Sequence, residues 1–531
     1  MIPRWAPPVA VSAREKRILT RVRKRRRLFA FLREHRHELF DEEFQRELEA
    51  MYRQTGSGKR PVPPALLAMV VLLQAYDDVS DAEAVERAVC DARWQLVLDC
   101  LGCEDAPFSQ GALHDFRQRL IAHEMDRRLL ERSRELAKRT NAFDYKKLPK
   151  QVEVAVDSSP LQGAGRVEDT FNLLAHAAMK LVLCVARLRD RPVELLADEL
   201  GIPLLAESSI KKALDIDWDD DEARSAALER LLGQIEALER WVLTNLKDEA
   251  KESPLREVLE VLERLREQDL EPDPSGGGRR VKQGVAKDRR VSIEDPDMRH
   301  GRKSKTKAFN GYKRHVAVDL ATKMILAVAL RPANEPEREA LPELWDELCE
   351  QHLDVSEIYM DRGYIGSDVI VEMLDAGVDI VCKPWAHPNH GRFTKADFQF
   401  DLRSRIVSCP GGQSVSFTPG KQLCFDEARC ASCEVRVSCT TSERGRRLSI
   451  ASDELLQERL RRRARTPKGR ARLRKRTGVE HTLAHVGRRQ GRRARYLGTR
   501  KNLYDLRRTA TVVNLETIQH DLEAPRLAQA A

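Results

Sequence analysis

Five short runs of alternating, β-branched residues lie between residues 151 and 385, and segments with helical spacing separate them. A succession in the order β, β, β, α, β, α, β builds a mixed α/β sheet flanked by helices. The second and third runs adjoin and predict a hairpin. Within this region, Ser367 predicts the cap of a helix that ends at Gly377. The runs are QVEVAVD at 151–157, GYKRHVAVDL at 311–320, MILAVAL at 324–330, SEIYMD at 356–361 and DIVCKPW at 379–385.

Two long segments, 14–140 and 166–270, have apolar residues at helical spacing instead. Ser80 with Glu83 predicts a capping box, and Ser109 predicts the cap of a later helix. The chain has 531 residues and is too long for one core. We divide it into a helical N-terminal domain (1–150), for which the Lys- and Arg-rich segment 14–27 predicts DNA binding, a first core strand (151–165), a helical insertion and linker (166–285), an α/β core (286–385), a Cys-rich insertion (386–455), C-terminal core helices (456–520) and a disordered tail (521–531).

Basic residues are concentrated in two segments, although the net charge is only +9, from 93 Lys and Arg against 84 Asp and Glu. One segment is 14–27. The other, 457–501, holds 18 Lys and Arg and only two acidic residues. Clustered positive charge of this kind indicates a nucleic-acid partner. Solvated basic tails are the plain alternative, although an apolar helical pattern follows the second segment.

Glu480 is one of the two acidic residues in segment 457–501, where DNA phosphate would repel a carboxylate. A salt bridge to Arg476, one helical turn earlier, is a local explanation. A divalent metal ion is the other explanation, and it would need further carboxylates. Asp157 and Asp361 each end a predicted strand, where sites in α/β sheets lie, and Mg²⁺ takes hard oxygen ligands. Taken alone, either Asp could simply cap a turn.

These blocks and their order resemble a DDE transposase of a bacterial insertion sequence. VAVDSSPL at 154–161 is similar to the family's first catalytic strand, and YMDRGYIGS at 359–367 to its Asp-x-Gly-Tyr motif. RKRTGVEHTL at 474–483 resembles the helix that carries the final Glu, and residues 63–120 resemble the helical domain that precedes the core.

The resemblance implies an RNase H-like core in which Asp157, Asp361 and Glu480 form the catalytic triad and hold Mg²⁺ or Mn²⁺. It also implies double-stranded DNA as the partner, both the element ends and the target. The expected DNA contacts are Arg476, which would contact a phosphate, Arg488, Arg472 and Lys313.

Two positions beside Glu480 depart from the family pattern. Leu473 stands where related transposases often carry Tyr, and Gly487 stands where they carry Lys. Arg488 follows Gly487 and is the candidate replacement, although a shift of one residue turns a helical side chain by about 100°. The expected triad is therefore better supported than the phosphate contacts around it.

The function that the resemblance implies is transposition. The protein would bind the terminal inverted repeats of its element, cleave DNA with metal ions and transfer the freed strands to a target. Two ends must be brought together, so we expect a homodimer in the synaptic complex. Two alternatives remain: a catalytically inactive DNA-binding protein derived from a transposase, and an RNase H-like nuclease without strand transfer.

Four cysteines, Cys409, Cys430, Cys433 and Cys439, include a C-x2-C pair of the kind that binds structural Zn²⁺. Free buried thiols are the alternative. The chain has eleven cysteines and no apolar run of 18 residues. We therefore expect reduced thiols, no membrane partner and a cytoplasmic, nucleoid-associated protein.

Overall fold

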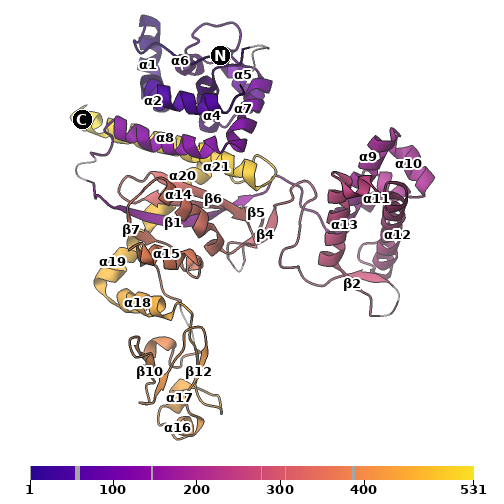
Figure 1. Ribbon diagram of the computed structural model, residues 1–531, viewed down its shortest axis with the longest axis vertical. Helices are drawn as coiled ribbons and strands as arrows, with labels where there is room; N and C mark the ends of the chain where they lie inside the picture. Colours follow the sequence, from indigo (N-terminus) through magenta and orange to yellow (C-terminus); the bar gives the residue numbers. More distant parts are fainter. Residues whose placement is uncertain are drawn as a thin grey trace.

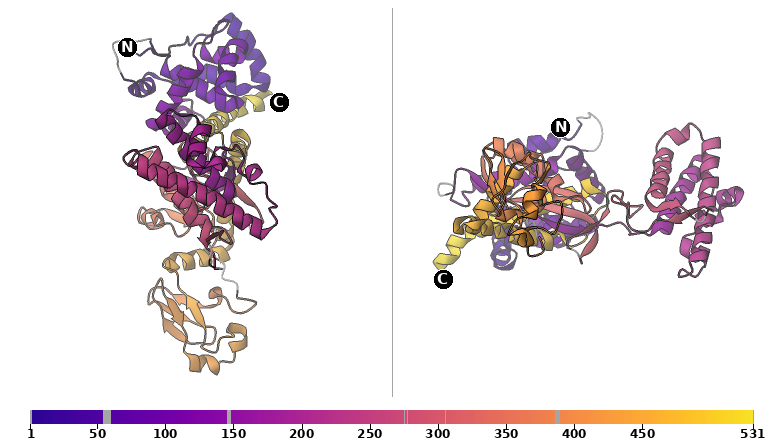
Figure 2. Two further views of the ribbon diagram at one scale, coloured as in Figure 1. Left: turned by 90° about the vertical axis from the view of Figure 1, so that its right-hand side faces the viewer. Right: turned by 90° about the horizontal axis from the view of Figure 1, so that it is seen from below.

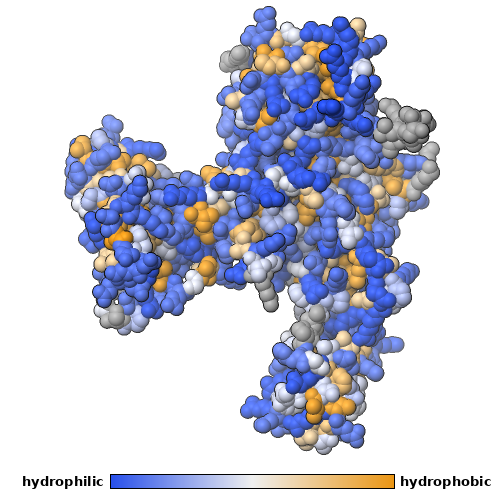
Figure 3. All heavy atoms as spheres, turned by 180° about the vertical axis from the view of Figure 1, so that it is seen from behind, coloured by the Kyte–Doolittle hydropathy of each residue, from blue (hydrophilic) through white to orange (hydrophobic). Residues whose placement is uncertain are grey.

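The fold is described from a computed structural model. It describes residues 2–53, 60–144, 148–274, 276, 278–304, 306–385 and 389–530, with side chains as far as residue 523. A mixed sheet lies at the centre, with a helical domain above it, a helical insertion to one side and a Cys-rich region below (Figure 1). The space-filling view shows a largely hydrophilic surface over all of these parts (Figure 3).

The central sheet has the strand order β4-β5-β1-β7-β8, and β6 pairs with β5 beyond the end of β4. β1 is antiparallel to β5 and parallel to β7, and β7 is parallel to β8. This is the mixed α/β, RNase H-like sheet that the sequence predicts. Its strands are β1 (Val152–Gln162), β4 (Arg299–Arg302), β5 (Ala308–Asp319), β6 (Ile325–Pro332), β7 (Val355–Tyr359) and β8 (Asp379–Val381).

Helices cover both faces of the sheet, and the side chains of β1 alternate between them. Val154 and Val156 belong to a core on the α14 and α15 side, whereas Ala155 packs with residues of α20 and α21. Asp157 therefore projects toward α20. The covering helices are α14 (Leu341–Glu350), α15 (Val369–Asp375), α18 (Glu454–Arg465), α19 (Pro467–Lys475), α20 (Thr477–Gln490) and α21 (Thr499–Ala530), with short 3₁₀ turns η3 (Glu337–Ala340) and η4 (Arg362–Tyr364).

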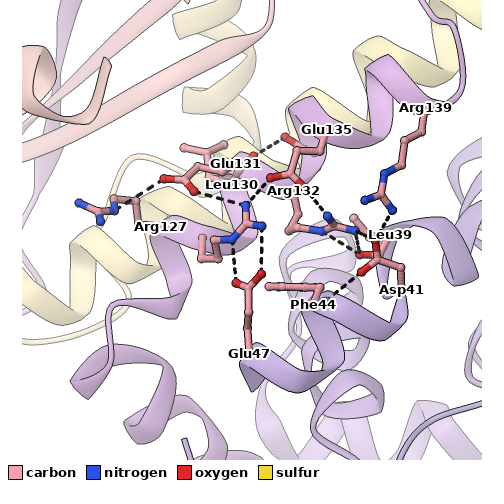
Figure 4. Close-up of polar contacts among 12 residues, drawn as sticks. Leu39, Asp41, Phe44, Glu47, Arg127, Leu130, Glu131, Arg132, Glu135 and Arg139 are labelled. Atoms are coloured by element: carbon pink, nitrogen blue, oxygen red, sulfur yellow. Dashed lines mark hydrogen bonds and ion pairs between the residues drawn. The ribbon is translucent and has the colours of Figure 1, made fainter. Parts of the chain in front are cut away.

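The N-terminal domain consists of helices, and the predicted caps at Ser80 and Ser109 are present. Arg128 binds Glu47 and Arg132 binds the carbonyl of Leu39, so that α8 is fixed to α2 and α3 (Figure 4). The helices are α1 (Ala13–Arg25), α2 (Arg27–Leu39), α3 (Glu42–Ala50), α4 (Pro64–Asp77), α5 (Asp81–Cys90), α6 (Ala92–Leu98), α7 (Gln110–Ala122) and α8 (Met125–Arg139).

Buried Asn514 on α21 joins this domain to the sheet. Its side-chain oxygen accepts the Ile325 N–H at 2.7 Å, and its amide donates to the Ile325 carbonyl at 2.8 Å and to Ser133 Oγ on α8 at 2.9 Å. A buried amide that is fully satisfied in this way fixes three elements in one arrangement.

The insertion after β1 packs its own apolar core, in which Ile293 is the only residue from beyond it. The chain enters and leaves at one point, where the Glu168 N–H donates to the Val291 carbonyl at 2.9 Å. Figure 2 shows the insertion standing apart from the sheet. Its elements are α9 (Thr170–Arg189), α10 (Val193–Leu200), η1 (Pro203–Ala206), α11 (Ile210–Leu214), α12 (Asp221–Asn245), η2 (Glu249–Lys251), α13 (Leu255–Asp269), β2 (Leu270–Pro272) and β3 (Arg279–Val281).

Helix α9 is, among the described residues, the one helix long and apolar enough to cross a membrane. More than half of its apolar window is buried inside the insertion core. A core helix passes the same length and composition test, so this is weak evidence for a membrane span.

The Cys-rich region forms small sheets around a separate core of aromatic and aliphatic residues. In the sequence it lies between β8 and α18, and in space it hangs below α18, on the far side of that helix from the central sheet (Figure 1). Its elements are η5 (Lys395–Asp397), β9 (Gln399–Asp401), β10 (Ile406–Ser408), β11 (Ser414–Ser416), β12 (Gln422–Cys424), α16 (Glu427–Ala431), α17 (Arg436–Cys439) and β13 (Arg447–Ser449).

The predicted end of the first strand at Asp157 is wrong, because β1 continues to Gln162. From Val156 to Leu161, β1 pairs with β5 alone, and this pairing runs on to Gln162 opposite Gly311, where Gln162 also bridges to Arg493. Pro160, whose nitrogen cannot donate a hydrogen bond, is tolerated in a strand with only one partner. The sequence Ser-Ser-Pro therefore continues the strand instead of turning it.

Three other predicted boundaries differ from the structure. β7 ends at Tyr359, two residues before Asp361. Ser367 does not cap the following helix, because Asp368 is the N-cap residue and makes no side-chain cap bond. The predicted disordered tail is helical as far as Ala530, because contacts such as the ion pair from Arg27 to Glu523 at 2.9 Å hold α21 against the N-terminal domain.

We predict that residues 166–293, expressed alone, fold as a helical unit, because the insertion has its own core and its two ends meet. Thermal unfolding followed by circular dichroism would show one cooperative transition. Leu231→Ala, at a fully buried position of α12, should destabilise the fragment by about 2–5 kcal/mol. Leu243→Ala on the same helix, where the side chain is 56% exposed, is the matched control. A fragment without a cooperative transition would contradict this prediction.

Candidate active site

Asp157 lies on the central strand and faces α20. It pairs with Val316 of β5, and its side chain is only 19% exposed. One carboxylate oxygen accepts the Ser158 N–H at 2.8 Å. Since Val154 and Val156 anchor the strand in the core on the opposite face, the sheet holds the Asp157 carboxylate in a fixed direction.

Asp361 follows β7 at the same edge of the sheet. Ala155 pairs with Tyr359 in the parallel ladder, so Asp157 and Asp361 each stand two residues beyond the last pair. The Asp361 carboxylate accepts the Arg362 N–H at 2.8 Å and opens the turn η4. Both acids therefore lie just beyond the end of the parallel ladder between β1 and β7, Asp157 inside β1 and Asp361 after β7.

Arg476 joins the third predicted acid to this edge. Its guanidinium donates to Asp157 Oδ2 at 3.0 Å and to Glu480 Oε1 at 3.2 Å. Buried Val479 and Leu483 fix α20 on the sheet, so Glu480 lies over the end of β1 with its side chain 52% exposed. The local salt bridge that the sequence leaves open is present, and it also reaches Asp157.

The electrostatics of Asp157 show that the three acids are neighbours. Burial is the main cause that raises the pKa of Asp157, and the charges of Glu480 and Asp361 raise it further. The Ser158 N–H and the Arg476 guanidinium act in the opposite direction. Burial and two neighbouring negative charges destabilise the ionised Asp157 carboxylate, so an added positive charge would stabilise it.

The predicted donor set fits a hard divalent cation in kind, because all three side chains are carboxylates. Within the described ranges, however, no three His, Cys, Asp or Glu side chains are close enough together to hold a metal ion. Arg476 lies between Asp157 and Glu480, and its guanidinium supplies the positive charge that balances these two carboxylates. The acids can close on a cation only if this guanidinium moves aside.

The other predicted DNA contacts have different surroundings. Arg472 pairs with Glu357 at 3.0 Å and with Asp379 at 2.7 Å, so it fixes α19 to the sheet. Lys313 donates to the Glu335 carbonyl at 2.6 Å, and burial lowers its pKa. Arg488 is exposed on the last turn of α20. Of the four predicted contacts, Arg472 and Arg476 are held in ion pairs, Lys313 is hydrogen-bonded to a carbonyl, and Arg488 is exposed.

Two residues that sequence reasoning missed also lie near the triad. Arg314 is largely buried and ties β1 to the end of α20 by donating to the Pro160 and Gly491 carbonyls at 2.9 and 3.0 Å. Glu337 accepts a hydrogen bond from Ser158 Oγ at 2.5 Å. An Arg within an apolar strand is a signal that could have identified Arg314. No sequence signal could have identified Glu337, because its contact with Ser158 joins segments far apart in the sequence.

The four predicted cysteine ligands line one pocket of the Cys-rich region. Cys409 Sγ accepts the Gln413 N–H at 3.3 Å, and a methyl group at Gly411 would lie 2.7 Å from Cys433 Sγ. Cys424 is exposed and does not line the pocket. All eleven cysteines are free, and the four thiols are not at ligand spacing, so Zn²⁺ remains a prediction.

Two family models match the chain. A transposase DDE domain matches residues 285–515, and a transposase domain (DUF772) matches residues 20–119. The first spans the core strands after the insertion and the helix with Glu480, and the second spans most of the N-terminal helices. Searches of curated proteins and of solved structures found no match.

Both matches are to transposase domains and agree with the mixed α/β fold, so the protein is a transposase, an enzyme that acts on DNA. More particularly, the chain belongs to the DDE transposases of insertion sequences, whose members typically use divalent metal ions.

Asp157→Asn should raise the melting temperature at pH 7 in metal-free buffer. A raised pKa means that the folded state favours the protonated carboxyl, so stability is lost as the pH rises from the ordinary Asp pKa of about 3.9 through the folded value. The neutral amide avoids this cost. Thermal melts from pH 3 to pH 8 would show that the difference in melting temperature between Asp157→Asn and the wild type shrinks toward acid pH. A variant that melts below the wild type at pH 7 would contradict the expectation.

We also predict one Zn²⁺ per chain in the Cys-rich pocket. Elemental analysis of the purified protein should find the metal, and Cys433→Ser should lose it. Cys424→Ser, at the exposed cysteine outside the pocket, is the matched control and should keep it. Wild-type protein without zinc would favour the alternative of free thiols.

Proposed function

We propose that this transposase binds the terminal inverted repeats of its element and catalyses metal-dependent cleavage and strand transfer with Asp157, Asp361 and Glu480. The observation that carries the proposal is the Arg476 bridge, which joins the acid of the central strand to the acid of α20. Asp361 lies at the same sheet edge, in register with Asp157. Three acids from distant segments, with an Arg beside them, suit a metal and phosphate site.

The carboxylates would hold Mg²⁺ or Mn²⁺, which activates the attacking oxygen and neutralises the leaving oxygen in phosphodiester chemistry. Asp157 and Asp361 are held by the sheet and supply fixed oxygen ligands. Glu480 is more exposed and can adjust on its helix. Arg476 is well placed to pass from the two acids to a DNA phosphate once those acids hold a cation, since guanidinium groups bind phosphate in a bidentate manner.

The DNA partner is supported by exposed positive charge on two surfaces. Helix α1 carries seven Lys and Arg, and the turn from α18 into α19 exposes Arg465, Lys468 and Arg470. Other arginines of the basic segment are used inside the protein, because Arg459 and Arg463, like Arg472, pair with Asp379. The DNA-binding charge is therefore a subset of what the sequence contains.

The proposal includes double-stranded DNA at both element ends and target, a homodimer that holds the two ends, and a cytoplasmic, nucleoid-associated location. The homodimer follows from the reaction, which needs two element ends in one complex, and the location follows from the DNA partner. The contacts of Arg476, Arg488, Arg472 and Lys313 with DNA belong to the same proposal. The ion pairs of Arg472 make it the one whose direct DNA contact is least expected.

Asp361→Asn should abolish strand cleavage while leaving binding to the element ends intact. The Asn side chain keeps the shape of the turn but removes the charge that a metal ligand needs. The assay is cleavage of labelled end DNA with Mg²⁺ or Mn²⁺, alongside a gel-shift measurement of end binding. Asp368→Asn, an exposed acid in the same segment, is the matched control and should keep wild-type cleavage.

Retained cleavage by Asp361→Asn would overturn the assignment of the triad. Addition of target DNA to the same reaction separates the transposase from the alternative nuclease, since only a transposase joins the donor ends to the target. A wild-type protein that binds ends but never cleaves them would instead favour the inactive DNA-binding protein.

A further inference from the structure

Glu337 lies between the two segments that carry the aspartates. Its Oε1 accepts the Ser158 hydroxyl at 2.5 Å, next to Asp157 on β1. Its Oε2 lies against Gly363, where an added methyl group would be only 2.2 Å away, two residues after Asp361. One carboxylate therefore touches the strand of the first acid and the turn of the second.

Gly363 leaves room for this carboxylate. Its φ angle is not positive, so the backbone conformation does not require glycine there. A Cβ at residue 363 would lie 2.2 Å from Glu337 Oε2 and would push the end of this flexible side chain aside. A larger residue at position 363 would therefore change the position of the Glu337 carboxylate.

Buried side chains also hold this turn against β5. Tyr364, the last residue of η4, shares a hydrogen bond of 2.8 Å with His315 Nδ1 on β5. Burial lowers the pKa of His315 to about 3, so the imidazole stays neutral. Tyr364 fixes the end of the turn to β5 and also interacts with the Ser158 side chain of β1. Glu337 adds a contact between Ser158 and the middle of the turn at Gly363.

We propose that Glu337 is a positioning residue of the active site, which clamps the strand of Asp157 to the turn of Asp361. The inference rests on the proposed function, because it assigns Glu337 a role toward those two acids. Side chains behind metal ligands set the ligand geometry, and their loss typically reduces metal affinity or activity 10- to 100-fold. Misplacement by about 0.5 Å is enough to impair such a site.

The test is a titration of Mg²⁺ and Mn²⁺ in the end-cleavage assay with full-length protein. Glu337→Ala should raise the metal concentration for half-maximal cleavage about tenfold, with unchanged binding of end DNA in a gel shift. Glu337→Gln should stay close to the wild type, because its amide oxygen still accepts the Ser158 hydroxyl. Glu339→Ala, at an exposed acid of the same short turn, is the matched control.

A double-mutant cycle tests the clamp itself. Ser158→Ala should impair cleavage. Adding it to Glu337→Ala should lower the cleavage rate little further, because both substitutions remove the same Ser158–Glu337 hydrogen bond. Melting temperatures of all variants separate loss of positioning from loss of folding, and the intact fold of Glu337→Gln keeps the test decisive if Glu337→Ala unfolds.

Metal dependence of Glu337→Ala equal to that of Glu339→Ala would overturn the clamp. So would a Glu337→Gln variant as defective as Glu337→Ala, because the charge and not the hydrogen bond would then matter. Asp361→Asn, assayed in parallel, separates the two proposals. Full cleavage by Asp361→Asn overturns the proposed function, whereas loss of cleavage there, combined with normal Glu337→Ala, overturns only the clamp.

Discussion

The ladder between β1 and β5 is the constraint on which the rest of the structure depends. β1 is central in the sheet, yet its partners β5 and β7 follow it only after the entire insertion. Because one face of β1 packs on α14 and α15 and the other on α20, its register determines which side chains reach the site. A slip by one residue would turn Asp157 away from α20 and bring Val156 toward it.

Arginine pairing is the second organising element, and it has two different roles. Arg472 fixes α19 to the sheet, and Arg500 and Arg507 meet buried Asp126 where α21 crosses α8. These pairs hold elements together. Arg476, in contrast, neutralises two of the acids of the proposed catalytic triad. A buried ion pair loses much when one partner is removed, so the structural arginines are poor candidates for DNA contacts.

Much of the fold could be predicted because strands and helices differ in hydrophobic period. The runs at 311–320 and 324–330 form the predicted hairpin, and Ser80 forms its capping box. The end of β1 could not be predicted, because tolerance of Pro160 depends on which neighbour continues beside it. The family resemblance predicts the three acids, whereas the strand-end argument misplaces Asp157, which lies inside β1. Glu337 could not be found, because its partners come together only through the sheet.

The meeting of the insertion ends at Glu168 and Val291 has a consequence for the order of folding. An unfolded loop of the 145 residues between β1 and β5 (163–307) would carry a large closure entropy and slow the pairing of distant strands. Since the insertion packs a core of its own and returns the chain to its starting point, the intervening segment behaves as a short link once it has folded. The folded insertion thereby favours the pairing of β1 with β5. Its length can change without altering the spacing between its two ends, and so without altering how far apart it holds these two strands.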